Sequence, residues 1–320
     1  MHASLINATK MLWSLKSRSL NIRISLYTYL YLCALTCCIK SKWSYLSLKF
    51  KMWFISKIVV PRSAGSRLWR CPSRQSQRGE GDHVGSRILV AFDFDQTIIQ
   101  QDSYLAVSQL LPKARRNISL LQILPKFGWQ TYINFVLQLL HEKHKVDSST
   151  SVGQQIRSIP AVPGMLHLMR RLNRTPTVDM CIISDANWFF ISEWLESYGI
   201  SCLFTDIKTN AACVQADGML LILPYEDQIG CDLCTRNLCK GGVLQQMRRG
   251  EVYKQVIYVG DSCNDLCPMK SLRPGDVACI RIGFELHSKM VAHGKMLSCS
   301  VVGWRDGHEL EKRLLSRIAW

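Results

Sequence analysis

Hydrophobic residues in the later part of this chain gather in short runs of strand length. Ile88 to Phe92 is such a run, and others lie at residues 178–184, 202–207, 256–259 and 277–282. Short, mostly apolar runs are typical of strands that are buried on both faces of a sheet. We therefore predict strands at these five places.

Segments with helical spacing separate the runs. Apolar residues recur at helical intervals between residues 102 and 146, and again over residues 187–198, where Gly199 is placed to end the helix. Asp217-Gly218 predicts a tight turn. Alternating strands and helices predict an α/β fold, a parallel sheet with helices on both faces, in which residues 102–146 form a small helical insert.

The net charge of +16 is concentrated near the N-terminus. Residues 1–79 contain 14 Lys and Arg and no Asp or Glu, so the rest of the 320-residue chain is close to neutral. A basic appendage does not indicate a nucleic-acid-binding body, and we expect no nucleic-acid partner. The length allows one large domain or two smaller ones.

Residues 24–39 of this appendage are mostly apolar and have basic residues on both sides. They are shorter than the about 20 residues that span a bilayer, and they lack a convincing signal-peptide cleavage site. The acid-free composition fits a mitochondrial transit peptide better. We favour an unstructured extension, or upstream sequence outside the working protein, for residues 1–86. We expect a cytoplasmic location, with mitochondrial targeting as the alternative, and membrane association only if residues 24–39 provide it.

The 14 cysteines do not show the spacing of a small disulfide framework. Cys231, Cys234 and Cys239 are close in sequence and supply three thiolates, whereas a structural zinc site takes four ligands. His287 or Cys263 could complete such a set, but the spacing favours neither. We expect a reduced, packed cysteine cluster, with zinc as the alternative.

The strand at residues 88–92 leads directly into Asp93-Phe94-Asp95-Gln96-Thr97. Carboxylates at alternate positions of a strand end lie on one face, and both need partners. A divalent metal would relieve their repulsion, and so would a reaction that uses one as nucleophile and the other as acid or base. A turn or a helix cap is the structural alternative. Thr97 is placed to contact an anion.

Three further motifs end a predicted strand or begin a predicted helix. Ser184 and Asp185 precede a helix, where a hydroxyl beside free N–H groups binds anions, or where either residue caps the helix. Lys240 offers a cation for a phosphoryl oxygen. Asp261 is a candidate metal ligand, and Asp265 would orient the lysine or cap the next helix. Since ligands of open α/β sheets bind at the carboxyl ends of strands, we expect these residues to converge.

Four segments carry a resemblance to a known family: VAFDFDQTII at 90–99, IISDAN at 182–187, CDLCTRNLCK at 231–240 and YVGDSCNDLCP at 258–268. With them the body resembles the haloacid dehalogenase (HAD) superfamily phosphatases, and more narrowly their phosphoethanolamine/phosphocholine phosphatase branch, which has pyridoxal-phosphate phosphatase relatives. The resemblance runs from about Arg87 to the C-terminus.

This resemblance implies an architecture and a reaction. The fold would be a HAD-like Rossmannoid parallel sheet formed by residues 87–99 and 160–320, with a helical cap at 100–159 that closes over the site. The reaction would be Mg²⁺-dependent hydrolysis of a small-molecule phosphate ester through an aspartyl-phosphate. The resemblance implies Asp93 as nucleophile and Asp95 as general acid/base. Lys240 and Ser184 would hold the phosphoryl oxygens, with Asn264 and Asp265 in support. Mg²⁺ would be held by Asp93, Asp261 and the backbone carbonyl of Asp95.

Substrate selection in that branch is linked to acidic residues near the first two motifs. Asp185 matches the second of them, but Tyr104 stands where the first would fall, with Asp102 two positions away. Losing a carboxylate weakens selection for an ammonium group, whereas a tyrosine can hold a cation on its ring or stack on a pyridine ring. Phosphoethanolamine, phosphocholine and pyridoxal 5′-phosphate therefore all stay open.

Two alternatives keep the same fold. The same residues could act on phosphoserine or a nucleotide. A non-catalytic binding protein would be expected to have lost Asp93, Asp95, Lys240 or Asp261, and all four are present. The sequence predicts no oligomeric state.

Overall fold

The computed structural model of the chain describes residues 87–114, 116, 124–144, 148–215, 217–250, 253–293 and 297–318. The predicted extension at 1–86, with its apolar segment at 24–39, lies outside the described residues. Within the ranges described, no helix is long and apolar enough to cross a membrane.

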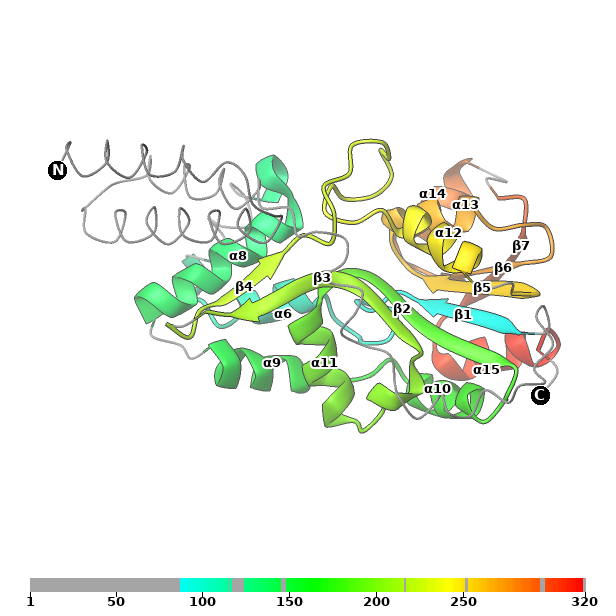
Figure 1. Cartoon of the computed structure of the whole chain (residues 1–320), viewed down its shortest axis with the longest axis horizontal. Coiled ribbons are helices and arrows are strands. Elements are labelled where there is room, and N and C mark those ends of the chain that lie inside the picture. The colour runs from blue at the N-terminus through cyan, green and yellow to red at the C-terminus, as the bar shows by residue number, and fades with distance from the viewer. Residues whose placement is uncertain are drawn as a thin grey trace, which may run out of the picture. The chain divides into compact units, whose positions relative to one another are not determined.

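A seven-stranded sheet in the order β4-β3-β2-β1-β5-β6-β7 forms the centre of the body (Figure 1). All neighbouring strands are parallel except β3 and β4, which form an antiparallel hairpin across the predicted turn at Asp217-Gly218. This arrangement confirms the predicted α/β class. The strands are β1 (Ile88–Phe92), β2 (Val178–Asn187), β3 (Asp206–Val214), β4 (Leu220–Leu223), β5 (Gln255–Gly260), β6 (Val277–Arg281) and β7 (Ser300–Trp304).

Helices cover both faces of the sheet (Figure 1). One face carries α10 (Met165–Asn173), α11 (Trp188–Ser197) and α15 (Gly307–Leu315), and the other carries α12 (Lys240–Gly250), α13 (Leu266–Lys270) and α14 (Glu285–His293). The remaining helical elements are α6 (Ser103–Ser108), α8 (Leu124–His144), η1 (Ser148–Val152), α9 (Gly153–Arg157), η2 (Ser201–Leu203) and η3 (Cys263–Asp265).

Strand β1 shows why its sequence is apolar throughout. Ile88, Val90 and Phe92 pack into the core under α10, α11 and α15, whereas Leu89 and Ala91 pack into the core under α12 and α13. Because alternate residues of a strand face opposite sides, a strand with helices on both sides needs apolar residues at every position. The prediction of a strand buried on both faces is confirmed.

The predicted strand at 202–207 is wrong in its first half. Residues 201–203 form the short helix η2, and β3 begins only at Asp206. Leu203 and Phe204 are buried without strand pairing. Their apolar character reflects packing into the core under α10, α11 and α15. Strands β4 and β7 were not predicted, because each is short and lies at an edge of the sheet.

The helical segment after β1 is tied to the hairpin at the sheet edge. In α8, the Asn134 side chain donates to the carbonyl of Ile222 at 2.8 Å and accepts from its N–H at 2.8 Å. This pair satisfies backbone groups of edge strand β4 that lack a further strand. Contacts between α9 and α11 attach the same segment to the sheet's helical layer.

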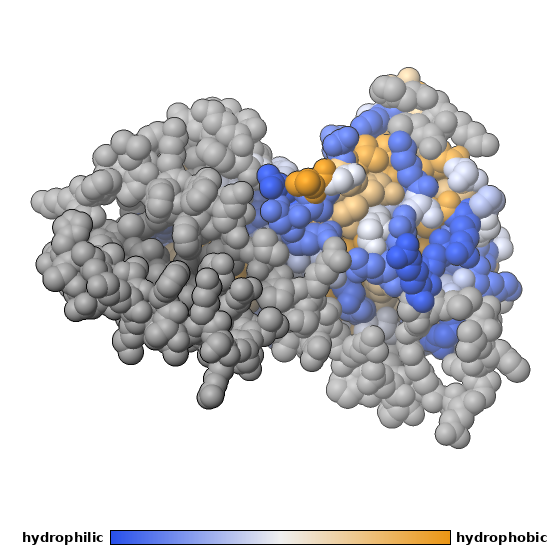
Figure 2. Space-filling model, turned by 45° about the horizontal axis from the view of Figure 1, so that its top comes forward, coloured by the Kyte–Doolittle hydropathy of each residue, from blue (hydrophilic) through white to orange (hydrophobic). Residues whose placement is uncertain are grey.

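Residues 224–239 connect β4 to α12 without a helix or strand. On the described part of the face in Figure 2, hydrophobic and hydrophilic residues lie side by side. Within this loop Ile229 is 85% exposed, so its side chain does not anchor the loop to the body.

Candidate active site

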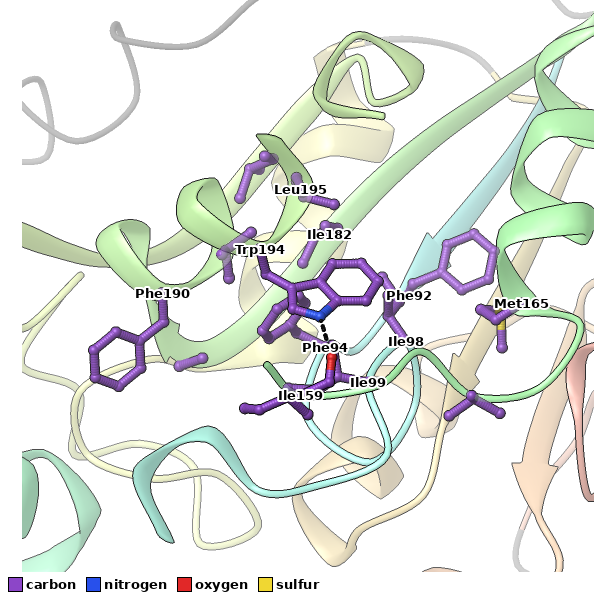
Figure 3. Packing of buried hydrophobic residues seen from close by; sticks show 14 of the residues in the cluster. Phe92, Phe94, Ile98, Ile99, Ile159, Met165, Ile182, Phe190, Trp194 and Leu195 are labelled. Carbon is purple, nitrogen blue, oxygen red and sulfur yellow. Dashed lines mark hydrogen bonds between the residues drawn. The ribbon is translucent and has the colours of Figure 1, made fainter. Parts of the chain in front are cut away.

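The segment after β1 is held by the sheet and by the core beneath it. The Asp93 N–H donates to the carbonyl of Val259 on β5 at 2.9 Å, which extends the β1–β5 pairing by one residue. Phe94 is fully buried and meets the Trp194 ring edge-on at 5.8 Å, and the Trp194 indole N–H donates to the Ile159 carbonyl at 2.8 Å (Figure 3). Phe94 thus anchors the backbone between the two aspartates.

The strand register sets the other motifs beside Asp93. Phe92 pairs with Ile182 on β2 and with Val259 on β5, so Ser184 and Asp261 lie just beyond the same level of the sheet. The carboxyl ends of three adjacent parallel strands therefore carry the predicted residues, as expected for a ligand site of an α/β sheet.

Lys240 is the buried cation of this group. Its Nζ lies 3.0 Å from Oδ2 of Asp93 and 2.7 Å from Oδ1 of Asp265. Burial lowers the pKa of Lys240, but the charges of Asp265, Asp93 and Asp185 outweigh that effect and raise the pKa overall. The lysine therefore stays protonated between two carboxylates.

Both carboxylate oxygens of Asp265 accept hydrogen bonds from neighbouring groups of the site. Oδ1 accepts from Lys240 and from the Tyr258 hydroxyl at 3.0 Å, and Oδ2 accepts from the N–H groups of Asp261 and Ser262 at 3.0 and 3.1 Å. Both alternatives considered for Asp265 thus hold, since it orients the lysine and forms a capping box at η3.

Asp93, Asp261 and Asp265 form a buried acidic group whose carboxylate oxygens lie within 4.8 Å of one another. Oδ1 of Asp93 is buried and has no hydrogen-bond partner among the described residues. Thr97 donates its hydroxyl to Oδ1 of Asp261 at 3.1 Å, and its contact with a bound anion stays a prediction. Thr97 therefore orients a carboxylate.

The electrostatics of these carboxylates fit a divalent cation. Burial raises the pKa of Asp93 to about 7, against the opposing effect of Lys240, and burial with the charges of Asp265 and Asp93 raises the pKa of Asp261 well above its usual value. Hard oxygen ligands and an unpartnered buried oxygen suit a cation such as Mg²⁺. Since the donors of Asp265 occupy both of its oxygens, Asp93 and Asp261 are the side chains best placed to hold it.

Asp95 faces the start of α6. Its two oxygens accept from the N–H and the hydroxyl of Ser103, both at 3.0 Å. Burial, together with the charges of Asp102 and Asp93, raises the pKa of Asp95 well above its usual value. Asp102 caps α6 by accepting from the Leu105 N–H at 2.8 Å, and burial raises its pKa to about 6. Such an environment keeps a proton available on Asp95.

Asn187 caps α11, which overturns the alternative of a cap at Ser184 or Asp185. Its side chain accepts from the Phe190 N–H at 3.1 Å. Ser184 is buried at the end of β2, where its hydroxyl accepts from the Ala186 N–H at 3.2 Å. The carboxylate of Asp185 is not used by the helix.

Asp185 links several loops of the site. Its carboxylate accepts from the Thr235 hydroxyl at 3.3 Å and from the Asn264 amide at 3.2 Å. Its carbonyl accepts from the Tyr104 hydroxyl at 3.0 Å and from the Asn210 amide at 2.7 Å. Asp185 and Asn264, both predicted as site residues, therefore lie in contact.

Tyr104 is buried in an aromatic group. Its ring meets that of Phe190 edge-on at 5.8 Å and lies 6.3 Å from that of Trp129. Burial and the charges of Asp185 and Asp95 raise its pKa well above the usual value, so its hydroxyl stays a donor. Where the resemblance leads one to expect an acid, the structure has a neutral hydrogen-bond donor to Asp185.

Sequence reasoning missed several residues of this site. Ser103, Tyr258, Thr235 and Asn210 each bind a predicted site residue through a hydrogen bond that joins distant parts of the chain or separate elements. Ser103 alone had a local signal, because it follows the helix-capping Asp102. Thr235 and Tyr258 lie inside two of the segments that carry the resemblance, but nothing local marks either as a site residue, and Asn210 lies in a segment without a motif.

A mostly parallel sheet whose adjacent strand ends carry Asp93, Asp95 and Asp261, with Lys240 beside them at the start of α12, is typical of HAD superfamily phosphatases. The sequence model of the family described as Putative Phosphatase matches residues 88–318. The chain belongs to this family and is a phosphatase.

Two relatives with similar sequences carry phosphatase names. The chain is 32% identical over 239 residues to a mouse (Mus musculus) protein named pyridoxal phosphate phosphatase PHOSPHO2, covering 71% of this chain and 97% of the relative. It is 30% identical over 243 residues to inorganic pyrophosphatase 2 of Arabidopsis thaliana, and the match covers 73% of this chain and 84% of the relative. The chain is also similar to a crystal structure of phosphoserine phosphatase in apo form, with 15% sequence identity and a TM-score of 0.49. That match covers 73% of this chain and 100% of the phosphoserine phosphatase chain.

Proposed function

We propose that this phosphatase is a Mg²⁺-dependent phosphomonoesterase that hydrolyses a small phosphorylated metabolite through an aspartyl-phosphate on Asp93. The observation that carries the proposal is the environment of Asp93. One of its oxygens is paired with buried Lys240, and the other is buried without a partner among the described residues, beside Asp261. A carboxylate held in this way suits attack on phosphorus.

The chain's own residues divide the reaction between them. Asp93 attacks phosphorus while the bond to the leaving oxygen breaks, and Asp95 gives that oxygen its proton. Asp95 then takes a proton from the water that hydrolyses the aspartyl-phosphate. The Ser103 hydrogen bonds aim Asp95, and its raised pKa supports the acid role. Lys240 and Ser184 hold phosphoryl oxygens.

Mg²⁺ bound by Asp93, Asp261 and the Asp95 carbonyl would supply charge neutralisation for the phosphoryl group. Thr97 and the Asp265 network would then serve to aim the ligands. The helical segment at 100–159, which carries Ser103 and Tyr104, would act as the cap that excludes water from the site.

Pyridoxal 5′-phosphate is the substrate that we propose first. The mouse relative is named for it, and Tyr104 with its aromatic neighbours provides rings near the Asp185 side of the site. Phosphoethanolamine and phosphocholine would pair their cationic groups with the Asp185 carboxylate, but Tyr104 stands where the related branch has a second acid. Pyrophosphate is the second candidate, because the Arabidopsis relative is named inorganic pyrophosphatase.

Phosphate release from a panel of substrates tests the proposal. The panel contains pyridoxal 5′-phosphate, phosphoethanolamine, phosphocholine, phosphoserine, a nucleotide and pyrophosphate, each with Mg²⁺ and with EDTA. We expect turnover that EDTA abolishes and Mg²⁺ restores, and a loss of at least about 10³-fold in Asp93→Asn. Unchanged activity in EDTA or in this variant would contradict the mechanism, and a different preferred ester would contradict only the substrate.

A further inference from the structure

Four cysteines from two segments, the loop at 224–239 and helix α13, meet beside the active site. Cys231, Cys234, Cys239 and Cys267 each offer a sulfur, and the four sulfurs lie within 4.8 Å of one another. Neither His287 nor Cys263, the residues considered from sequence, belongs to this group; Cys267, which sequence reasoning missed, is the fourth thiol. We call these four residues the thiol cluster.

The separations of the sulfurs fit a tetrahedral metal. Cys231 Sγ lies 3.5 Å and Cys239 Sγ 3.8 Å from Cys267 Sγ, and all four cysteines are free. A tetrahedron of thiolates with Zn–S bonds of about 2.3 Å has edges of about 3.8 Å. The observed distances are far longer than the about 2.05 Å of a disulfide.

The sequence predicts a reduced, packed cysteine cluster, and the four free thiols agree with it, but burial among apolar residues does not account for their place. All four residues are partly exposed, whereas Cys181 and Cys279 are fully buried in the hydrophobic core. The Gly242 N–H donates to Cys239 Sγ at 3.4 Å, at the first turn of α12. A helix N-terminus and N–H···S bonds both favour the negative charge of thiolates bound to a metal.

The loop at 224–239 is built to present these sulfurs. Gln228 accepts from the Cys231 N–H at 2.9 Å and donates to the carbonyls of Cys231 at 3.1 Å and Thr235 at 2.9 Å, so one side chain shapes the turn between Cys231 and Cys234. The loop has no regular secondary structure and exposes Ile229. Loops of more than about 12–15 residues without secondary structure are uncommon in compact domains and are often functional.

We propose that the thiol cluster binds one structural Zn²⁺, with Cys231, Cys234, Cys239 and Cys267 as its four ligands. Four sulfur ligands in a closed set favour zinc, or failing that iron, over harder cations. Binding displaces the thiol protons to solvent, and the four thiolates complete the coordination.

The zinc site would position the catalytic residues without touching the substrate. Cys239 directly precedes Lys240, Cys267 lies two residues after Asp265, and Cys234 Sγ donates to the Asn264 carbonyl at 3.7 Å. The metal thus joins the loop that carries Thr235 and Lys240 to the segment that carries the acidic residues. This role is separate from the Mg²⁺ proposed above and does not depend on the substrate.

Metal analysis of the full-length protein tests the proposal. After weakly held ions are removed with EDTA and gel filtration, we expect about one zinc per chain. Growth with cobalt should give the visible ligand-field and sulfur charge-transfer bands of a tetrahedral tetrathiolate. Both measurements use the wild-type chain, so they decide the question even if a cysteine variant does not fold.

Matched variants assign the ligands. Cys231→Ser and Cys267→Ser should lose most of the zinc, while Cys202→Ser and Cys213→Ser, which change exposed cysteines outside the cluster, should keep it. Gln228→Ala should weaken zinc affinity about 10–100-fold in competition with a chromophoric chelator, with Gln138→Ala on α8 as its control. Asp261→Asn should retain zinc, which separates this metal from the one at the acidic group.

Several outcomes would overturn the inference. They are wild-type protein free of zinc, zinc that persists in both Cys231→Ser and Cys267→Ser, and iron with the absorption of an iron–sulfur centre in place of zinc. A disulfide within the cluster in freshly purified protein would count against it equally.

Discussion

At the scale of single residues, one buried lysine balances several carboxylates. Lys240 pairs with Asp93 and Asp265, and Asp261 lies beside them. The anions outnumber the cation, which is unfavourable in a buried site unless a further positive charge binds. The same excess of negative charge would favour a divalent cation, in line with the Mg²⁺ that we propose at Asp93 and Asp261.

Asp265→Asn tests how far this arrangement depends on a residue without a direct chemical role. The amide would turn an N–H₂ group toward donors that now point at the carboxylate, including Lys240. We expect a loss of about 3–5 kcal/mol in the free energy of unfolding, measured by urea denaturation. Asp227→Asn, which breaks the more exposed ion pair with Arg236, should change the free energy of unfolding little. Equal losses would show that burial is not the cause.

Tyr104→Asp tests the residue that departs from the related branch. A carboxylate at this position, close to Asp185, would add negative charge where a cationic head group would lie. We expect the ratio of kcat/KM for phosphoethanolamine or phosphocholine to that for pyridoxal 5′-phosphate to rise by about tenfold or more. Tyr104→Phe, which removes only the hydroxyl, is the control and should leave the ratio little changed. An unchanged ratio in both variants would remove Tyr104 from substrate selection.

At the scale of elements, the turn after β5 determines where the acidic residues point. A Cβ at Gly260 would lie 2.4 Å from Cγ of Asp265, so only glycine lets η3 fold back onto the strand end. This close approach directs the Asp265 carboxylate toward Lys240 and toward the N–H groups of its own turn.

Gly260→Ala should therefore damage both stability and activity. We expect overpacking to cost about 1–3 kcal/mol in thermal or urea unfolding, and kcat to fall because the lysine loses its alignment. Gly275→Ala is the matched control, since a Cβ there meets no atom within 4 Å. Normal kcat in a stable Gly260→Ala protein would show that the turn can relax without moving the lysine.

The element scale also shows which local patterns were informative. The helix at 187–198 was predicted from its apolar face and from Gly199, and α11 occupies Trp188–Ser197 with Asn187 and Tyr198 as caps. The run at 202–207 also looked like a strand, yet residues 202 and 203 belong to the short helix η2 and β3 begins only at Asp206. Periodicity is reliable over several turns, but a run of three or four apolar residues satisfies either structure.

At the scale of the whole molecule, the site lies entirely within the part that matches the family. Residues 88–318 contain every residue that we assign to catalysis, and the basic charge is concentrated before Glu80. We propose that residues 1–86 are an extension that the reaction does not require.

Comparison of the full chain with residues 87–320 tests that proposal. We expect kcat/KM to agree within about twofold, because a domain with its own core folds and works alone. Fractionation of both forms with and without membranes measures any effect of residues 24–39 separately. Loss of activity on truncation, with the remaining chain folded by circular dichroism, would give the extension a role in the reaction.

The sequence by itself determined the strands that carry chemistry and the residue types at their ends. A local rule is enough for this, because an apolar run followed by Asp93, Ser184 or Asp261 marks a buried strand and a polar strand end. Parallel strands bring such ends to one edge of the sheet, so the convergence of Asp93, Lys240, Asp261 and Asp265 could be predicted without coordinates.

Only the tertiary structure decided which of these residues touch and what each is free to do. Cys267 joins Cys231 across 36 residues, and Thr97 reaches Asp261 across 164, so neither contact leaves a trace in local periodicity. The Asp185 carboxylate is available for contacts within the site because Asn187 caps α11. The Tyr104 hydroxyl reaches the Asp185 carbonyl because α6 packs beside it. Side-chain contacts between distant segments depend on how whole layers pack, and packing is a property of the complete fold.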